Sequence, residues 1–139
     1  MKVAIIGKGN VGKALSSGLG PAGHEVRFGT RDPDESVGAA AGWGEVIVLA
    51  VPFSQVKNVA GSIGHLTDGK VLIDVTNVMG ADGSMALGFT TSGAEELQKM
   101  LPKSRVVKAF NTVFAKHQGT GRIGQARLSA FLAVPAGAL

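Results

Sequence analysis

Short apolar runs alternate along the chain with segments of helical periodicity, and this pattern predicts an α/β fold. Residues 3–6 form an uninterrupted, β-branched apolar run, which is typical of a strand buried on both faces of a parallel sheet. Residues 25–29 alternate between polar and apolar positions and predict a half-buried strand. Further strands are predicted at residues 45–50, 70–74, 105–110 and 128–134.

Amphipathic segments between these runs predict helices on the faces of the sheet. We expect them at about residues 11–19, 33–41, 54–63 and 92–100. The segment at residues 33–41 is close to the shortest connection that joins parallel strands. Ser92 and Glu95 have the spacing of a capping box. The whole chain, residues 1–139, is therefore interpreted as one α/β domain with a doubly wound, mainly parallel six-stranded sheet and a shortened second helix.

A glycine-rich turn directly follows the first predicted strand. Gly7, Gly9 and Gly12 have the G-x-G-x-x-G spacing of a turn that admits a pyrophosphate and lets a helix pack closely on the strand. Asn10 is expected to cap that helix, whose free N–H groups would face the phosphates. The chain contains 21 glycines, so the spacing alone is weak. Its position between a buried strand and a helix favours a dinucleotide site of Rossmann type over an ordinary tight turn.

The residues after the second strand predict which nucleotide binds. A carboxylate at this position hydrogen-bonds the free ribose hydroxyl of NAD(H), whereas an arginine accommodates the 2′-phosphate of NADP(H). This chain has Thr30 and Arg31 there, so we expect NADP(H). Asp32 is interpreted as the N-cap of a helix that starts at Pro33, and not as a displaced ribose carboxylate.

The ends of the later strands are expected to line the nicotinamide side of the same crevice, because ligands of open α/β sheets bind outside the carboxyl ends of the strands. The candidate residues are Val51, Pro52, Phe53, Asn77, Phe110, Asn111 and Thr112. Phe53 has the alternative of packing in the core. Asp74 and Asn77 are interpreted as tying down the loop backbone, with direct ligand contact as the alternative. Trp43 is interpreted as packing over an edge of the sheet, with adenine stacking as the alternative.

The amino-acid composition excludes several kinds of site and partner. Hydrophobic residues make up 45% of the chain and charged residues 17%, as in a folded, well-buried domain. The absence of cysteine excludes disulfides, thiolate metal sites and thiol nucleophiles, and we expect no metal. The net charge of +4 comes from scattered residues, so nucleic-acid binding is not expected. The chain shows neither a signal peptide nor an apolar run long enough for a membrane, so a cytoplasmic location is expected.

Two blocks of sequence resemble the NADPH-dependent coenzyme F-420 reductase family. They comprise residues 2–7, 9–12, 23–26, 29–33 and 48–52, and then residues 71–77, 91–95 and 106–112. The resemblance covers nearly everything up to Phe114. Related cytoplasmic domains of ferric reductases are similar to the same pattern.

The resemblance implies particular contacts with NADP(H). The residues it places on the nucleotide are Gly7, Gly9, Asn10, Val11 and Gly12, with Thr30 and Arg31 on the 2′-phosphate. Val51, Pro52 and residues 110–112 would approach the nicotinamide, and Asn111 would lie where the second redox partner meets it. Two differences stand out. The second helix region is shorter than in the family and lacks a basic residue often found there, and the family continues past the sixth strand with helices that complete the acceptor pocket and the dimer contact.

We therefore expect an NADP(H)-dependent oxidoreductase that transfers hydride between NADPH and coenzyme F-420, a flavin or a similar small redox cofactor. The chain has no tyrosine, which excludes a Tyr–Lys relay for carbonyl reduction, whereas hydride transfer between two cofactors needs mainly alignment. A homodimer is expected, because a partner would supply the missing wall. The alternatives are a truncated NADP(H)-binding module or sensor and, more distantly, an imine reductase resembling pyrroline-carboxylate reductases.

Overall fold

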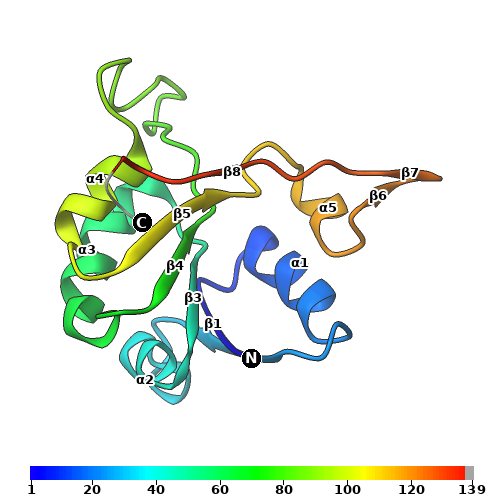
Figure 1. Ribbon diagram of the computed structural model, residues 1–139, viewed down its shortest axis with the longest axis horizontal. Coiled ribbons are helices and arrows are strands. Elements are labelled where there is room, and N and C mark those ends of the chain that lie inside the picture. The colour runs from blue at the N-terminus through cyan, green and yellow to red at the C-terminus, as the bar shows by residue number, and fades with distance from the viewer. Residues whose placement is uncertain (137–139) are drawn as a thin grey trace.

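A computed structural model of the chain describes residues 1–136, and a six-stranded sheet forms its centre (Figure 1). The strand order is β2-β1-β3-β4-β5-β8; the first five strands run parallel and β8 runs antiparallel to β5. The strands are β1 (Lys2–Ile6), β2 (Glu25–Gly29), β3 (Val46–Leu49), β4 (Val71–Asp74), β5 (Arg105–Ala109) and β8 (Leu132–Ala133). The predicted α/β fold with a mainly parallel six-stranded sheet is confirmed.

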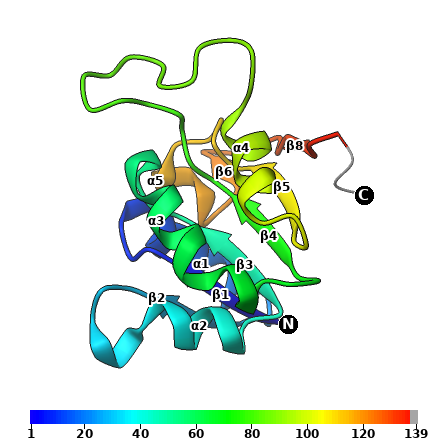
Figure 2. The same ribbon diagram turned by 90° about the vertical axis from the view of Figure 1, so that its left-hand side faces the viewer.

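Helices cover both faces of this sheet, as Figures 1 and 2 show. On one face lie α1 (Asn10–Leu19) and α5 (Ala115–Gln118). On the other lie α2 (Val37–Trp43), α3 (Phe53–Ile63) and α4 (Gly93–Met100), together with the short 3₁₀ helices η1 (Pro33–Glu35) and η2 (Gly64–Leu66). The molecule is therefore a three-layered, doubly wound structure.

The hydrophobic core explains why the first strand is continuously apolar. Val3 and Ile5 pack on the α1 side, whereas Ala4 and Ile6 pack on the side of α2, α3 and α4. All four side chains are at most 3% exposed. Because both faces of β1 are covered, neither set of alternating positions can be polar.

The prediction of a single helix at residues 33–41 is wrong in detail, because the chain forms two helices there. Asp32 caps η1 by accepting a hydrogen bond from Asp34 N–H at 3.0 Å, which confirms its predicted capping role. Ser36 is extended and caps α2 by accepting from Ala39 N–H at 3.2 Å. The break folds η1 back onto the end of β2, where Thr30 N–H donates to the Glu35 carbonyl at 2.6 Å.

Trp43 lies at the amino edge of the sheet. Its ring packs under the guanidinium of Arg27 at 4.3 Å and lies 5.9 Å from Nζ of Lys2, the first residue of β1. The glycine turn follows the opposite end of the same strand. The interpretation of Trp43 as an edge-packing residue is therefore confirmed.

The C-terminal part of the described chain differs most from the prediction. The strand expected at residues 128–134 shortens to β8, because only Lys108 and Ala109 of β5 pair with it. A hairpin of β6 (Arg122–Ile123) and β7 (Ala126–Arg127), which was not expected, projects from the body (Figure 1). Phe131 and Leu132 are each 69% exposed. Within residues 1–136, no helix has the length and apolarity needed to cross a membrane.

Candidate functional site

The carboxyl ends of β1, β3, β4 and β5 meet at one edge of the sheet, and four adjoining cavities follow this edge. The chain order reverses between β1 and β3, since β2 pairs with one side of β1 and β3 with the other. Such a reversal is where open α/β sheets bind ligands. The cavities have volumes of about 320, 240, 310 and 420 Å³. Neighbouring cavities share lining residues, so they adjoin one another along this edge, which is called here the recess.

The glycine turn is built as the motif requires. Gly7 has a φ of +108°, and its N–H donates to the Gly29 carbonyl at 2.9 Å, which joins the turn to β2. A Cβ on Gly7 would overlap the Ala50 carbonyl, and a Cβ on Gly12 would overlap the Gly7 carbonyl. At Gly9, apart from the residue itself and its two chain neighbours, no atom of residues 1–136 lies within 4 Å of the place where a Cβ would stand. Gly7 and Gly12 are thus needed by the fold, whereas Gly9 faces open space.

Helix α1 starts one residue earlier than the sequence predicts. Gly9 is the N-cap, with extended backbone at φ −79° and ψ −167°, and Asn10 is the first helical residue. The expected N-cap role of Asn10 is therefore wrong, because the second glycine already turns the chain into the helix. Within the described part of the chain no side chain caps this end. Its free N–H groups consequently remain available for an anion.

The first cavity, of about 320 Å³, lies between the glycine turn, the end of β2 and the start of α3, and is called here the glycine-turn cavity. Its lining includes six of the predicted residues, Gly7, Gly9, Thr30, Arg31, Val51 and Pro52. Thr30 Oγ1 accepts from Asp32 N–H at 3.0 Å, while Arg31 is exposed. Lys8 also lines this cavity, although the sequence analysis did not single it out. Its position inside the glycine motif could have identified Lys8 as a candidate, because a basic residue there lies close to the expected phosphates.

The second cavity, the central cavity of about 240 Å³, joins the turn to the ends of β3 and β4. Its lining includes Gly9, Asn10, Val11, Val51, Pro52 and Asn77 from the predicted set, together with Thr76. Thr76 is 5% exposed, and its Oγ1 finds no hydrogen-bond partner among residues 1–136. A buried polar atom of this kind is costly unless a ligand or water pairs with it.

The third cavity, the Phe110 cavity of about 310 Å³, brings together Val11, Asn77, Phe110, Asn111 and Thr112. Phe110 has a φ of +63°, the one positive value at a non-glycine residue within residues 1–136. Such strain persists where the surrounding structure enforces it, and it gathers at functional sites. Here it marks the point at which the chain leaves β5 and enters the recess.

Two predicted residues lie outside these linings. Gly12 is buried beneath the turn, where it lets α1 approach the backbone of Gly7. Phe53 is half-buried, packs against the core cluster and stands 3.4 Å from the position that a Cβ on Gly93 would take. Its alternative interpretation as a core residue describes this placement.

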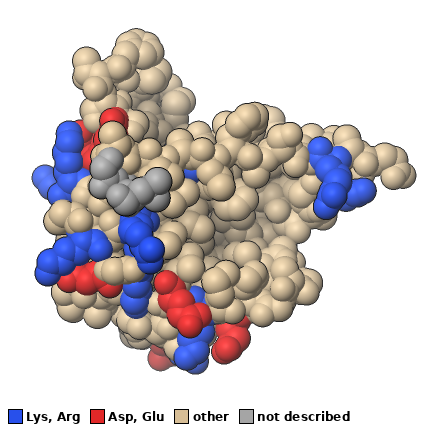
Figure 3. All heavy atoms as spheres, viewed as in Figure 1, with Lys and Arg blue, Asp and Glu red and all other residues tan. Residues whose placement is uncertain are grey.

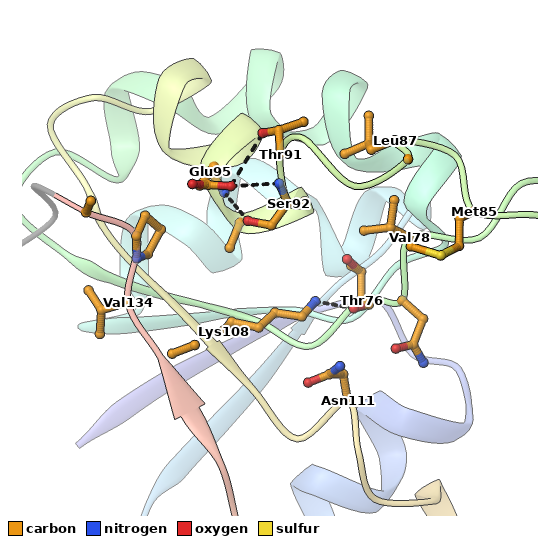
Figure 4. A pocket seen from close by; sticks show the side chains of 17 residues that line it. Thr76, Val78, Met85, Leu87, Thr91, Ser92, Glu95, Lys108, Asn111 and Val134 are labelled. Atoms are coloured by element: carbon orange, nitrogen blue, oxygen red, sulfur yellow. Dashed lines mark hydrogen bonds between the residues drawn. The ribbon is translucent and has the colours of Figure 1, made fainter.

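The fourth cavity, the Lys108 cavity of about 420 Å³, lies between β5, α4, β8 and the segment that precedes α4 (Figure 4). Lys108 Nζ points into it and donates to Asp74 Oδ2 at 3.0 Å and to the Thr76 carbonyl. Asp74 also accepts from Thr76 N–H at 2.9 Å. Asp74 therefore fixes the loop after β4, as its structural interpretation expected, and a charged amine stands in the wall of the cavity.

Glu95 lines the same cavity from the first turn of α4. The predicted capping box is confirmed: Ser92 N–H donates to the Glu95 carboxylate at 2.7 Å, and Glu95 N–H donates to Ser92 Oγ at 3.2 Å. Hydrogen bonding from the Ser92 side chain, and then from its backbone, lowers the pKa of Glu95 from its ordinary value of 4.5. The carboxylate form is thus favoured in the folded protein.

A Glu95→Gln substitution is expected to reduce stability near neutral pH and to have little effect in acid. A carboxyl group whose pKa is lowered by folding contributes stability above its ordinary pKa of 4.5, and that contribution is lost as the pH falls through the lowered value. Urea unfolding of both proteins at about pH 7 and about pH 3 would measure the difference. An equal difference at both pH values would contradict the expectation.

On the face shown in Figure 3, the basic groups form several clusters with uncharged and acidic surface between them. Among residues 1–136 there is no group of three or more His, Cys, Asp or Glu residues that could hold a metal ion. The residues of the recess instead offer backbone amides, small side chains and a few hydroxyl, amide and amine groups.

A doubly wound sheet with a glycine turn at its order reversal defines a protein of the Rossmann dinucleotide-binding class. The model of the NADP oxidoreductase coenzyme F420-dependent family matches residues 2–44 and 34–78, which together exceed half of the chain. The chain belongs to this family of NADP-dependent oxidoreductases.

Three relatives illustrate the family relation. The chain is 31% identical to the F420-dependent NADP reductase of Methanothermobacter marburgensis over 83% of its own length and 65% of that protein. It is 32% identical to Metalloreductase STEAP3 of Rattus norvegicus over 82% of its length and 25% of that protein. A crystal structure from Arthrobacter sp. FB24, provisionally described as an F420-dependent NADP reductase, superposes with a TM-score of 0.87 at 26% identity, over 99% of this chain and 75% of that one. The chain therefore spans 25% and 65% of the two curated relatives.

Proposed function

We propose that this protein binds NADP(H) along the carboxyl edge of the sheet and passes hydride between NADPH and a deazaflavin, flavin or similar redox acceptor. The observation that carries the proposal is the row of four adjoining cavities, which extends from the glycine turn to Lys108. When bound, the nicotinamide would supply or accept the hydride, so the protein has mainly to align two ligands.

The glycine-turn cavity is the proposed adenosine end. Gly9 leaves open space at the N-terminus of α1, where the backbone N–H groups would bind the pyrophosphate. Asn10 and Val11 begin the helix beside it. Thr30 and Arg31 follow β2 and would contact the 2′-phosphate, Arg31 through a charge-assisted hydrogen bond. These residue types fit an anionic nucleotide because they bring donors and no carboxylate into the first positions after the strand.

The central and Phe110 cavities are the proposed nicotinamide end. Val51 and Pro52 would form one wall, with Asn77, Phe110 and Thr112 opposite. The unpaired Thr76 Oγ1 offers a hydrogen bond in this place. Asn111 lines both the Phe110 cavity and the Lys108 cavity, so we propose that it stands between the nicotinamide and the acceptor. Phe53 would support this wall from the core.

The Lys108 cavity is the proposed acceptor site. Its walls combine apolar side chains, such as Val78 and Leu87, with the Lys108 amine (Figure 4). A flat, partly anionic ring system would match this mixture, because the apolar walls bury the ring and the amine attracts the charge. The site is bounded by β8, whose residues Leu132 and Ala133 are exposed. We propose that a second copy of the chain covers this side in a homodimer.

Calorimetric titration with NADPH and NADH, and then with oxidised deazaflavin and FMN in the presence of NADP⁺, tests the proposal. Tight NADPH binding followed by a second saturable site supports a reductase and identifies its acceptor class. NADPH binding alone favours the second candidate, a nucleotide-binding module or sensor, in which the glycine-turn and central cavities would hold the nucleotide without an acceptor site. Binding of neither nucleotide would contradict both functions.

Arg31→Ala is expected to weaken NADPH binding by about 2–3 kcal/mol, because it removes a charge-assisted bond to the phosphate. NADH lacks that phosphate, so its affinity should change little. Titration of the variant with both nucleotides measures the two effects. Equal losses for NADPH and NADH would contradict the assignment of Arg31 to the 2′-phosphate.

A further inference from the structure

One ion pair beside the glycine-turn cavity joins a residue of its lining, Lys8, to Glu35, which lies outside the lining. Lys8 stands between the first two glycines of the motif, and Glu35 ends η1. Lys8 Nζ lies 2.5 Å from Glu35 Oε1 and 5.2 Å from the centre of the Phe28 ring. The two side chains are 43% and 36% exposed. The pair is therefore at the rim of the cavity that also holds Thr30 and Arg31, and not in the core.

Glu35 is held close to the place proposed for the 2′-phosphate. The backbone of Glu35 accepts a hydrogen bond from Thr30 N–H at 2.6 Å, and Thr30 and Ser36 form a β-bridge. These contacts fix the backbone of Glu35 beside the end of β2, and the ion pair with Lys8 holds its carboxylate near the glycine turn. A carboxylate in this position repels a phosphate dianion unless a cation neutralises it.

We propose that Lys8 is a specificity-determining residue for the 2′-phosphate, an assignment that rests on the proposed function. Lys8 neutralises Glu35 in the free protein, and its ammonium turns to the phosphate when NADP(H) binds. Moving the ammonium from Glu35 to the phosphate costs little free energy, because an ion pair with this exposure is weak. The lysine side chain is also flexible and ends in a compact charge. A phosphate with two negative charges attracts the ammonium more strongly than one carboxylate does.

The position of Lys8 allows two other roles that make different predictions. If the Lys8 ammonium bound the pyrophosphate, it would contribute equally to the affinities for NADPH and NADH, because both nucleotides carry that group. An ammonium that only fastens η1 to the glycine turn would affect stability and not the ratio of the two affinities. The ratio of NADPH to NADH affinity is therefore the decisive quantity.

The experiment compares Lys8→Met, Glu35→Gln, the double variant and Lys57→Met in full-length protein, each titrated with NADPH and NADH at low and high salt. Lys57 is an exposed lysine of α3, so Lys57→Met is a control for loss of one surface charge. We expect Lys8→Met to weaken NADPH binding about tenfold or more and to change NADH binding by less than about twofold. Glu35→Gln should tighten NADPH binding, and in the double variant it should restore part of the loss. The effect of Lys8→Met should shrink as salt rises.

Three results would overturn the assignment. The first is equal weakening of NADPH and NADH by Lys8→Met, the second is unchanged NADPH affinity, and the third is a loss in Lys57→Met as large as in Lys8→Met. Failure of the wild-type protein to bind either nucleotide would overturn the proposed function and this assignment together. NADPH binding by the wild type with an unchanged ratio in Lys8→Met would overturn the assignment alone.

Discussion

Replacing Gly7 with alanine is expected to destabilise the fold by about 3 kcal/mol or more, because the change combines backbone strain with steric overlap. Gly7 has a φ of +108°, a conformation that side chains rarely adopt, and its Cβ would overlap the Ala50 carbonyl. The Ala50 carbonyl cannot easily move away from this Cβ, since it is part of the backbone that leaves β3. Urea unfolding followed by circular dichroism measures the change.

Gly9→Ala is the matched control for this prediction. Its backbone is extended, and beyond its two chain neighbours no other residue among residues 1–136 has an atom within 4 Å of the added methyl group. Stability should therefore change by no more than about 0.5 kcal/mol. NADPH affinity should nevertheless fall, because the methyl group would stand where we place the pyrophosphate. A stable Gly7→Ala protein would show that the turn is less tightly constrained than the structure indicates. An unaltered NADPH affinity in Gly9→Ala would count against the proposed nucleotide position.

Lys108→Met is expected to destabilise the protein by about 3 kcal/mol, the lower end of the cost of removing one partner from a buried ion pair, because Asp74 is buried but Lys108 only partly so. The side chain of Asp74 is 2% exposed and that of Lys108 is 19% exposed. Without the ammonium, the Asp74 carboxylate keeps the Thr76 N–H bond but loses its counter-charge. Because Lys108 also lines the proposed acceptor cavity, acceptor binding should weaken as well.

Two further variants separate the buried charge from a general effect of losing a lysine. Lys103 pairs with Asp68 at 3.2 Å, but these side chains are 76% and 47% exposed, so Lys103→Met should cost at most about 1 kcal/mol. Adding Asp74→Asn to Lys108→Met should recover part of the stability, since no unpaired charge then remains buried. Similar losses in Lys103→Met and Lys108→Met, measured by urea unfolding, would refute the explanation.

Periodicity and local motifs were sufficient to predict much of the fold. Three features depend only on residues that are close together in the sequence, and all three were found as expected. They are the apolar run in β1, the glycines after it and the Ser92–Glu95 capping box. Element ends were predicted less well where two local signals compete. Asp32 and Ser36 each cap a helix, so the segment became two short helices, and Gly9 took the capping position expected for Asn10.

The residues of the candidate site were likewise predicted only in part. Residues at strand ends, such as Thr30, Val51 and Asn111, could be predicted because the parallel sheet brings all carboxyl ends to one edge. Lys8 and Lys108 were not singled out, because a lysine in a glycine motif or in an apolar strand does not reveal its partner. Phe53 was placed correctly only by its alternative interpretation as a core residue.

The sequence by itself determined that this chain forms a parallel sheet with a glycine turn after the first strand, since helical and strand periodicities and glycine conformations are local properties. The tertiary structure decided which distant residues meet. Asp74 and Lys108 become partners because β4 and β5 pair in that register, and Lys8 meets Glu35 because η1 folds back onto β2. Register and loop direction depend on packing across the whole sheet, and no short stretch of sequence encodes them.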